Sequence, residues 1–359
     1  MKRLWVILAA LLLCAEGYAC TTAVVSAGAS ANGRPLLWKQ RDASDPYNVI
    51  ARVTRGPLSF TGLFPASDSL RTKCYAGINE AGFAIVNNIS YNMRPDSLGY
   101  DTCAGVTMAA ALASCRTVED FAAMLAGLPR PMNLSTNFGV ADSHGGAAYF
   151  EVGDSTFVRY DVPDGGMLFR TNFSLSGDPS RGRGHERFRT MEALTGQQGR
   201  FDASFFLGAG RSFLAEGRDA IAGSGTAGLR EHGFIPRSTT TAGIVIECPV
   251  DEGERGLMWC ATGYTPCCYA IPVWEGLELP AAVRGEANLA AVALHGQVHD
   301  GKMLKVKPLR RVLRAVERRE RRELRRGRKV QRRMSPEEVR RYNEGADRRF
   351  GKFKKKFGL

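Results

Sequence analysis

The sequence predicts a layered α+β fold, in which strand hairpins come first, helices follow and strands return before the C-terminus. Residues 21–26 and 36–40 are extended, apolar segments joined by a small-residue turn that contains Asn32-Gly33, which is typical of a hairpin. Helical periodicity then marks residues 107–113 and 117–128. This order favours an α+β sandwich over the regular strand and helix alternation of a parallel sheet.

The remaining strands and helices are predicted in the same way, from extended apolar segments and from helical spacing of apolar residues. We expect strands at 75–78 and 83–87, then at 138–141, 147–152, 156–160 and 166–171, helices at 185–195 and 201–207, and closing strands at 240–247, 256–260 and 268–272. Glycines and turn residues separate these strands, which are all short.

Residues 1–19 have the features of a secretory signal peptide. A basic start, Lys2-Arg3, precedes an apolar run that ends at Ala15, and small residues occupy the −3 and −1 positions of a cleavage site after Ala19. The apolar run is too short to span a bilayer, which needs about 20 residues. We therefore expect the chain to be exported, as a periplasmic or secreted protein that begins at Cys20.

An N-terminal Cys20 allows two interpretations. A lipid anchor on this residue would require a suitable preceding box, whereas Gly17 at −3 and the bulky Tyr18 at −2 fit such a box poorly. The other interpretation is catalytic, because a mature Cys20 carries a thiol with a reference pKa of about 8.5 and an α-amine with one of about 7.7 to 8.0. The amine can accept the thiol proton, so one residue supplies both nucleophile and base.

The net charge of +13 is very unevenly distributed along the chain. Residues 302–359 hold 24 Lys and Arg against 7 Asp and Glu, a net charge of +17, so residues 1–301 carry a net charge of −4. Any inference of nucleic-acid binding from the average charge thus applies to the tail alone, and export disfavours it. We divide the chain into the signal peptide 1–19, a catalytic domain 20–301 and a strongly basic helical tail 302–359.

The tail predicts two helices. An apolar stripe runs through 308–333, and Ser335 followed by Pro336 is typical of a capped second helix that extends to about residue 345. The tail could bind an anionic membrane or envelope polymer, contact a partner, or form a solvated extension with little role in catalysis. These alternatives remain open at this point.

The cysteines, two histidines and one basic segment predict no further functional site. Nine cysteines occur, and with Cys14 removed and Cys20 free at most three disulfides can form, in a connectivity that the sequence does not specify. His295 and His299 are spaced by four residues but lack a third ligand, so we expect surface histidines and no metal or cofactor. The basic segment 181–189 is expected to be a solvated loop.

Five segments in order resemble one known superfamily: Cys20-Thr21-Thr22, Lys39-Gln40-Arg41-Asp42, residues 77–83 (GINEAGF), Thr171-Asn172, and residues 237–241 (RSTTT). The resemblance covers about residues 20–278 and is to the N-terminal-nucleophile hydrolases. It is closest to their linear-amide branch, which includes the penicillin acyltransferase-like (AAT) enzymes and, more distantly, the choloylglycine hydrolases. The resemblance implies a four-layer αββα fold and cleavage of a linear amide C–N bond, or transfer of its acyl group, through a thioester.

The resemblance also implies roles for the residues around the nucleophile. Cys20 matches the nucleophile, and Arg41 and Asp42 match the pair that follows the second strand. Asp42 would orient the α-amine, and Arg41 would favour the thiolate and position an acidic substrate group.

Three further residues are carried over in the same way. Asn172 matches a side-chain donor of the oxyanion hole. The second donor falls within residues 87–89, where we choose Asn88, and Arg237 matches a basic residue that supports the nucleophile. The sequence does not decide between hydrolysis and acyl transfer, because acceptor binding and water exclusion determine that choice.

Overall fold

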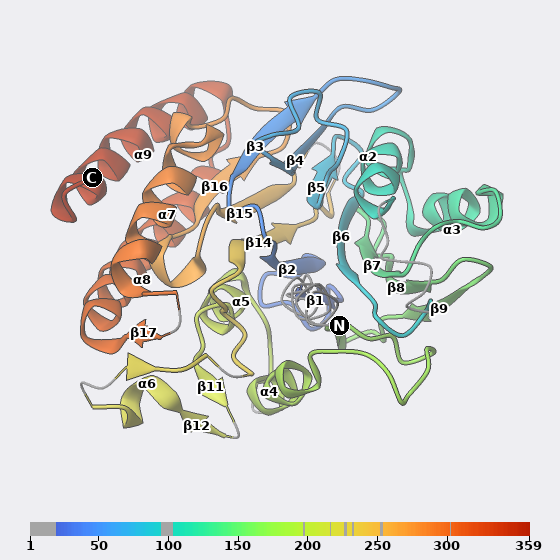
Figure 1. Ribbon diagram of the computed structural model, residues 1–359. Helices are drawn as coiled ribbons and strands as arrows, with labels where there is room; N and C mark the ends of the chain where they lie inside the picture. Colours follow the sequence, from blue (N-terminus) through green and yellow to red (C-terminus); the bar gives the residue numbers. More distant parts are fainter. Residues whose placement is uncertain are drawn as a thin grey trace.

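Two antiparallel sheets lie face to face between layers of helices (Figure 1). The computed structural model describes residues 19–94, 103–196, 198–215, 217–225, 228–231, 233–251, 254–301 and 303–359. The predicted signal peptide, apart from Ala19, lies outside these residues. The predicted αββα class is confirmed, because each sheet carries helices on its outer face.

The six-stranded sheet has the order β10-β1-β2-β14-β15-β16. Its strands are β1 (Thr21–Val25), β2 (Leu36–Asp42), β10 (Met167–Arg170), β14 (Thr240–Glu247), β15 (Leu257–Ala261) and β16 (Ile271–Trp274). The predicted hairpin is confirmed, since β1 pairs antiparallel with β2 and sets Thr22 opposite Lys39. The sheet joins chain segments about 200 residues apart, because β2 pairs directly with β14.

The seven-stranded sheet is a meander in which each strand pairs with the next. Its strands are β3 (Asn48–Val53), β4 (Phe60–Pro65), β5 (Ala76–Asn79), β6 (Ala84–Ile89), β7 (Thr136–Ala141), β8 (Ala147–Val152) and β9 (Phe157–Asp161). The strands β3 and β4 were not among those predicted. Side chains of β1 and β2 pack against β6 and β7, which closes the interior between the sheets.

Helices α2 (Ala104–Ser114) and α3 (Val118–Gly127) cover the seven-stranded sheet. The Asn79 side-chain amide donates to the carbonyls of Leu112 and Cys115, which ties β5 to the end of α2, and the Phe121 ring of α3 meets Phe138 and Phe150 edge-on. The other outer layer contains α4 (His185–Thr195), α5 (Ala203–Ala209), α6 (Ala220–Gly223), α7 (Glu286–Val298), α8 (Val306–Gln331) and α9 (Pro336–Lys356). Short elements complete it: β11 (Leu214–Ala215), β12 (Arg218–Asp219), β13 (Gly228–Leu229), β17 (Leu304–Lys305) and the 3-10 turns Thr265–Cys267 and Ala281–Arg284.

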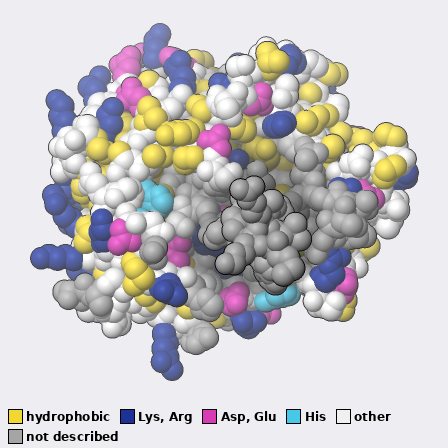
Figure 2. Space-filling model, in the orientation of Figure 1, with side chains coloured by type: hydrophobic (Ala, Val, Ile, Leu, Met, Phe, Trp, Pro, Cys, Tyr) yellow, Lys and Arg dark blue, Asp and Glu magenta, His cyan; other side chains and the backbone are white. Residues whose placement is uncertain are grey.

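The basic tail is packed into this outer layer, which excludes the solvated extension among the alternatives left open for it. Leu309, Val312 and Val316 of α8 are buried in the same core as β14 and β15. Buried carboxylates reinforce the contact: Glu320 binds Arg211 and accepts from the Ala270 amide, Glu247 binds Arg328, and Glu323 binds Arg349. Only the outer surface of the tail faces solvent, and there dark blue side chains gather along the edge where α8 and α9 lie (Figure 2).

The predicted second tail helix is confirmed but is longer than expected. Its cap is Ser335, whose hydroxyl accepts from the Glu338 amide 3.1 Å away, and Pro336 occupies the first turn. The helix continues to Lys356, because Tyr342, Phe350 and Phe353 keep its inner face buried well beyond residue 345.

No disulfide joins any two of the eight cysteines that the structure describes. Seven of them are buried, and burial raises the pKa of Cys74 to about 12. In the part of the chain that the structure describes, no helix is long and apolar enough to cross a membrane. The same residues contain no cluster of three or more His, Cys, Asp or Glu side chains suited to a metal ion.

Candidate active site

Cys20 directly precedes β1 and lies at the open end of the first hairpin, as predicted. Its side chain is buried, and its Sγ atom lies 3.9 Å from the backbone carbonyl oxygen of Asp42. The β1 and β2 register accounts for this proximity, since it sets Thr21 opposite Gln40, two residues before Asp42. The hairpin therefore brings together two residues that are 22 positions apart in the chain.

Asp42 is a buried carboxylate with an incomplete set of partners. Its Oδ1 atom accepts a hydrogen bond of 2.6 Å from the Thr240 hydroxyl, whereas Oδ2 has no hydrogen-bond partner among the described residues. Burial raises the pKa of Asp42 to about 6, and the positive charges of Arg187 and Arg237 oppose this rise. The side chain can thus take up or hold a proton near neutral pH.

Arg187 of α4 connects Cys20 to Asn172, the predicted oxyanion residue. Its Nη1 atom donates to the Cys20 carbonyl and to the Thr21 hydroxyl, and its Nη2 atom donates to Asn172 Oδ1, each at 2.7 Å. The expectation that segment 181–189 is a solvated loop is therefore wrong at this residue, which is only 3 % exposed. The helical spacing of Arg187 with the buried residues Thr190 and Met191 was the available signal.

Asn172 is completely buried, and its side-chain amide has a fixed orientation. The Nδ2 atom donates to the Ile89 carbonyl at 2.9 Å, while Oδ1 accepts from Arg187. A guanidinium has donors only, so the amide oxygen must face Arg187 and the amide nitrogen must face the opposite side.

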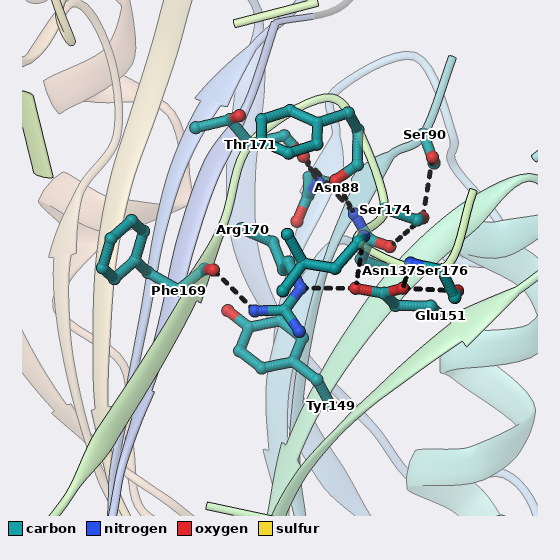
Figure 3. A network of polar contacts seen from close by, with 12 residues as sticks. Asn88, Ser90, Asn137, Tyr149, Glu151, Phe169, Arg170, Thr171, Ser174 and Ser176 are labelled. Carbon is teal, nitrogen blue, oxygen red and sulfur yellow. Dashed lines mark hydrogen bonds and ion pairs between the residues drawn. The ribbon is translucent and has the colours of Figure 1, made fainter. Parts of the chain in front are cut away.

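A network of polar contacts fixes the segment that follows Asn172 (Figure 3). Asn137 of β7 donates to the Phe173 carbonyl at 3.0 Å and accepts from the Ser174 hydroxyl at 2.5 Å. Glu151 of β8 accepts from the Ser176 amide at 2.7 Å and forms a buried ion pair with Arg170. The loop that carries Asn172 is therefore bonded to the seven-stranded sheet on one side and to Arg187 on the other.

Residues 87–89 were predicted to contain the second oxyanion donor, and each of the three contacts a residue of this site. The Asn88 side chain accepts from the Thr22 hydroxyl at 2.6 Å and donates to the Thr171 carbonyl, so both ends of its amide are engaged. Asn87 contacts Lys39, and Ile89 contacts Asn172. The choice of Asn88 as an oxyanion donor remains a prediction.

Lys39 lies in one of the five segments that carry the resemblance, but no role was predicted for it, and it is buried. Its Nζ atom donates to the backbone and side-chain oxygens of Asn87, both at 2.6 Å. Burial lowers the pKa of Lys39 to about 8, and the charge of a Cys20 thiolate would raise it. Lys39 stands three residues before Asp42 in β2, so the two side chains occupy opposite faces of the strand around Cys20.

The structure separates Arg41 from Asp42. Adjacent residues of a strand point to opposite faces, and the Arg41 guanidinium donates to Asn48 at 3.0 Å and to Thr241 at 2.7 Å, while its Cζ atom lies 4.6 Å from the Tyr75 ring centre. Arg237 is partly exposed, and its positive charge lowers the pKa of Asp42. The catalytic roles of both arginines remain predictions.

His295 and His299 are not the surface histidines expected from the sequence. The His295 ring lies against Tyr264 at a tilt of 37°, with centroids 4.3 Å apart, and burial lowers its pKa to about 4. The His299 side chain is 8 % exposed and lies 3.8 Å from the Glu231 carboxylate. Both histidines are therefore partly buried, one in the last turn of α7 and the other directly after it.

The αββα fold and the cysteine that directly precedes its first inner strand agree with the predicted resemblance to the N-terminal-nucleophile hydrolases. Residues 55–195 match the model of the AAT family, described as acyl-coenzyme A:6-aminopenicillanic acid acyl-transferase. This match covers 141 of the 359 residues and confirms the predicted resemblance to the AAT family; it agrees with hydrolysis of a non-peptide amide C–N bond or transfer of its acyl group. The matched segment includes Asn88, Asn172 and Arg187 but begins after Cys20.

Similar solved structures include an N-acylethanolamine-hydrolyzing acid amidase ortholog from Caenorhabditis elegans, with 12% identity, 63% of this chain and 92% of that chain covered, and a TM-score of 0.44. Penicillin V acylase from Agrobacterium tumefaciens has 15% identity, covers 71% and 86%, and has a TM-score of 0.42. A variant of conjugated bile acid hydrolase from Clostridium perfringens has 11% identity, covers 71% and 92%, and has a TM-score of 0.38. No curated protein sequence matches the chain significantly.

Proposed function

We propose that this protein is an exported cysteine N-terminal-nucleophile hydrolase that cleaves a linear amide through a thioester on Cys20. Signal cleavage after Ala19 releases the α-amine of Cys20. The observation that carries the proposal is the position of Cys20 beside Asp42, whose buried Oδ2 atom has no hydrogen-bond partner among the described residues. A free α-amine at this point supplies the donor that this carboxylate oxygen requires.

In this proposal the α-amine, Asp42 and Lys39 control the proton transfers of the reaction. The amine takes the thiol proton, and Asp42 holds the resulting ammonium, while the Lys39 cation on the other face of β2 favours the thiolate. The thiolate then attacks the amide carbonyl carbon, and the ammonium returns its proton to the departing amine. A thioester remains, and water activated by the same α-amine hydrolyses it to the free acid.

Asn172 stabilises the tetrahedral oxyanion in this proposal. Its Nδ2 atom carries two N–H groups, of which one donates to the Ile89 carbonyl, so the other is available for the substrate oxygen. Arg187 supports this role because it fixes the amide oxygen on the far side. A donor of this kind commonly contributes about 100-fold to 1,000-fold in rate.

The solved relatives act on N-acylethanolamines, penicillin V and conjugated bile acids, as their names state. We propose a small amide substrate of comparable kind for this chain. An amine that binds the acyl-enzyme in place of water would give acyl transfer from the same thioester, so both reactions should be assayed with one substrate panel.

The test is intact-mass analysis of the exported protein after reaction with a thiol-directed acyl probe. We expect the N-terminal residue to be Cys20 and one acyl adduct to form, and the adduct should persist in Cys103→Ala but disappear in Cys20→Ala. Labelling that survives in Cys20→Ala, or another mature N-terminus, contradicts the assignment.

The rival function is a non-enzymatic envelope protein anchored through a lipid on Cys20. A thioether-linked lipid would consume the thiol and leave no nucleophile. A diacylglycerol mass on the N-terminal peptide, with no turnover of any amide in the panel, would favour this rival.

A further inference from the structure

The outward face of α8 carries a row of cations that no carboxylate neutralises. Seven exposed residues recur three or four positions apart: Lys307, Arg311, Arg314, Arg318, Arg322, Arg325 and Lys329. At 3.6 residues per turn they fall within about 80° of the helix circumference and extend over about 33 Å. Among the described residues, none of the seven forms an ion pair. We call these residues the α8 row.

The distribution of carboxylates shows that this face differs from an ordinary soluble surface. Two of the three glutamates of α8, Glu320 and Glu323, are buried and bind Arg211 and Arg349 on the inner side. Helix α9 pairs four of its eight cations with carboxylates, whereas α8 pairs two of its twelve. A surface that only keeps a protein soluble carries positive and negative side chains interspersed. The α8 row carries positive side chains alone, so solubility does not explain it.

A groove of about 720 Å³ continues the row at its N-terminal end. Six cations line it: Lys307, Arg310, Arg311, Arg314 and Arg318 from α8, and Lys356 from the end of α9. The Phe357 ring lies below this groove, with its centre 5.7 Å from the Arg311 Cζ atom and 5.6 Å from Lys356 Nζ. The lining contains no acidic side chain, so an anion that enters the groove meets cations from both helices.

We propose that the α8 row and its groove bind a linear polymer of phosphate groups. A single straight row matches an extended chain better than a flat bilayer, which would require cations spread over a plane. Insertion into a bilayer is also disfavoured, because every apolar residue of α8 is buried or half-buried and none lies in the row.

The side-chain types point to the phosphate group as the feature recognised. Five of the seven residues are arginines, whose planar guanidinium donates two parallel hydrogen bonds to one phosphate. The row holds no Asn, Gln or aromatic side chain that could read or stack on a nucleobase. The polymer is therefore held through its repeating anions alone, and adjacent cations act together because their spacing is below the Debye length of about 8 Å at physiological salt.

Binding of long-chain inorganic polyphosphate to the full chain tests this proposal. The variant carrying Arg314→Glu, Arg318→Glu and Arg322→Glu should bind at least tenfold more weakly. Its salt dependence, the slope of log K against log salt concentration, should fall in magnitude by about 2, at about 0.7 per lost contact. Replacing the same three arginines by lysine should preserve most of the slope but reduce affinity several-fold, because the bidentate geometry is lost.

The matched control changes the same number of charges on the other helix, with Arg340→Glu, Arg341→Glu and Arg348→Glu. This variant should bind like the wild-type chain, and both variants should keep the wild-type melting temperature and amide turnover. Equal weakening by the control set, or absence of salt-sensitive binding, overturns the proposal. Tighter binding of anionic vesicles, or equal binding of polyglutamate with the same charge, would overturn the choice of a linear phosphate polymer.

Discussion

Replacing Gly327 by alanine tests whether the basic tail is packed into the fold. In an isolated helix this change is stabilising by about 1 kcal/mol, because glycine is a poor helix former. In the structure a methyl group at Gly327 would lie 2.5 Å from Cη2 of Trp259 and 3.1 Å from Cγ of Pro272. Trp259 is completely buried and donates to Glu247 at 2.7 Å, so its ring is not free to move away from an added methyl group. Overpacking of this kind costs about 1 to 3 kcal/mol.

Gly351→Ala in α9 is the matched control, since nothing lies within 4 Å of an added methyl group there. The helix-propensity gain is common to both variants, so the difference between their unfolding free energies isolates the steric cost at Trp259. We expect Gly351→Ala to be stabilising and Gly327→Ala to be less stable than it by about 2 kcal/mol, measured by urea unfolding with unchanged m-values. Equal stabilisation by the two substitutions would show that α8 does not rest on Trp259, and would refute the packing described above.

Three other results are expected. In the uncleaved chain, in which Cys20 has no free α-amine, Asp42→Asn should raise the free energy of unfolding above pH 6 by up to about 3 kcal/mol, because burial raises the carboxyl pKa from 3.8 to about 6 and the folded state disfavours its charge. The stability curves of the variant and the wild-type chain should meet below pH 4, and parallel curves would contradict this cause. In the mature enzyme the same substitution should lower amide turnover at least 100-fold, because no carboxylate then holds the α-ammonium. Glu320→Gln should lower the unfolding free energy by about 3 kcal/mol, since it leaves the buried Arg211 unpaired, and a change below 1 kcal/mol would count against that pair. A reducing agent should leave the melting temperature unchanged, because no disulfide joins any two of the eight described cysteines.

Most strands were predictable because their residues alternate or form short apolar runs between turn residues. The two strands that escaped prediction, β3 (NVIARV) and β4 (FTGLFP), do not alternate strictly between apolar and polar residues, and β4 contains a glycine in its interior. That glycine is required by tertiary contact, because a side chain at Gly62 would meet the Cys74 sulfur at 2.6 Å. The local sequence of β4 does not show its contact with the start of β5, so the reason for the glycine could not be recognised from that sequence.

The candidate site was predictable only where a residue has a place in a recognisable motif. Cys20 and Asp42 come together through a hairpin that the sequence indicates, so their proximity follows from local pattern. Arg187 and Lys39 did not stand out, because charged side chains are normally exposed and nothing nearby in the chain shows that these two are buried. Their partners, Cys20 and Asn87, are 167 and 48 residues away, so only the assembled fold reveals their function.

The pairing of β2 with β14 also determines when the site can exist during synthesis. The hydroxyl that holds Asp42 belongs to Thr240, 198 residues further along the chain, and the sheet around it is then covered by α8. A nascent chain therefore carries Cys20 first and acquires the environment of that residue last. Until its final helices have been synthesised, the chain lacks part of the outer layer that covers the six-stranded sheet.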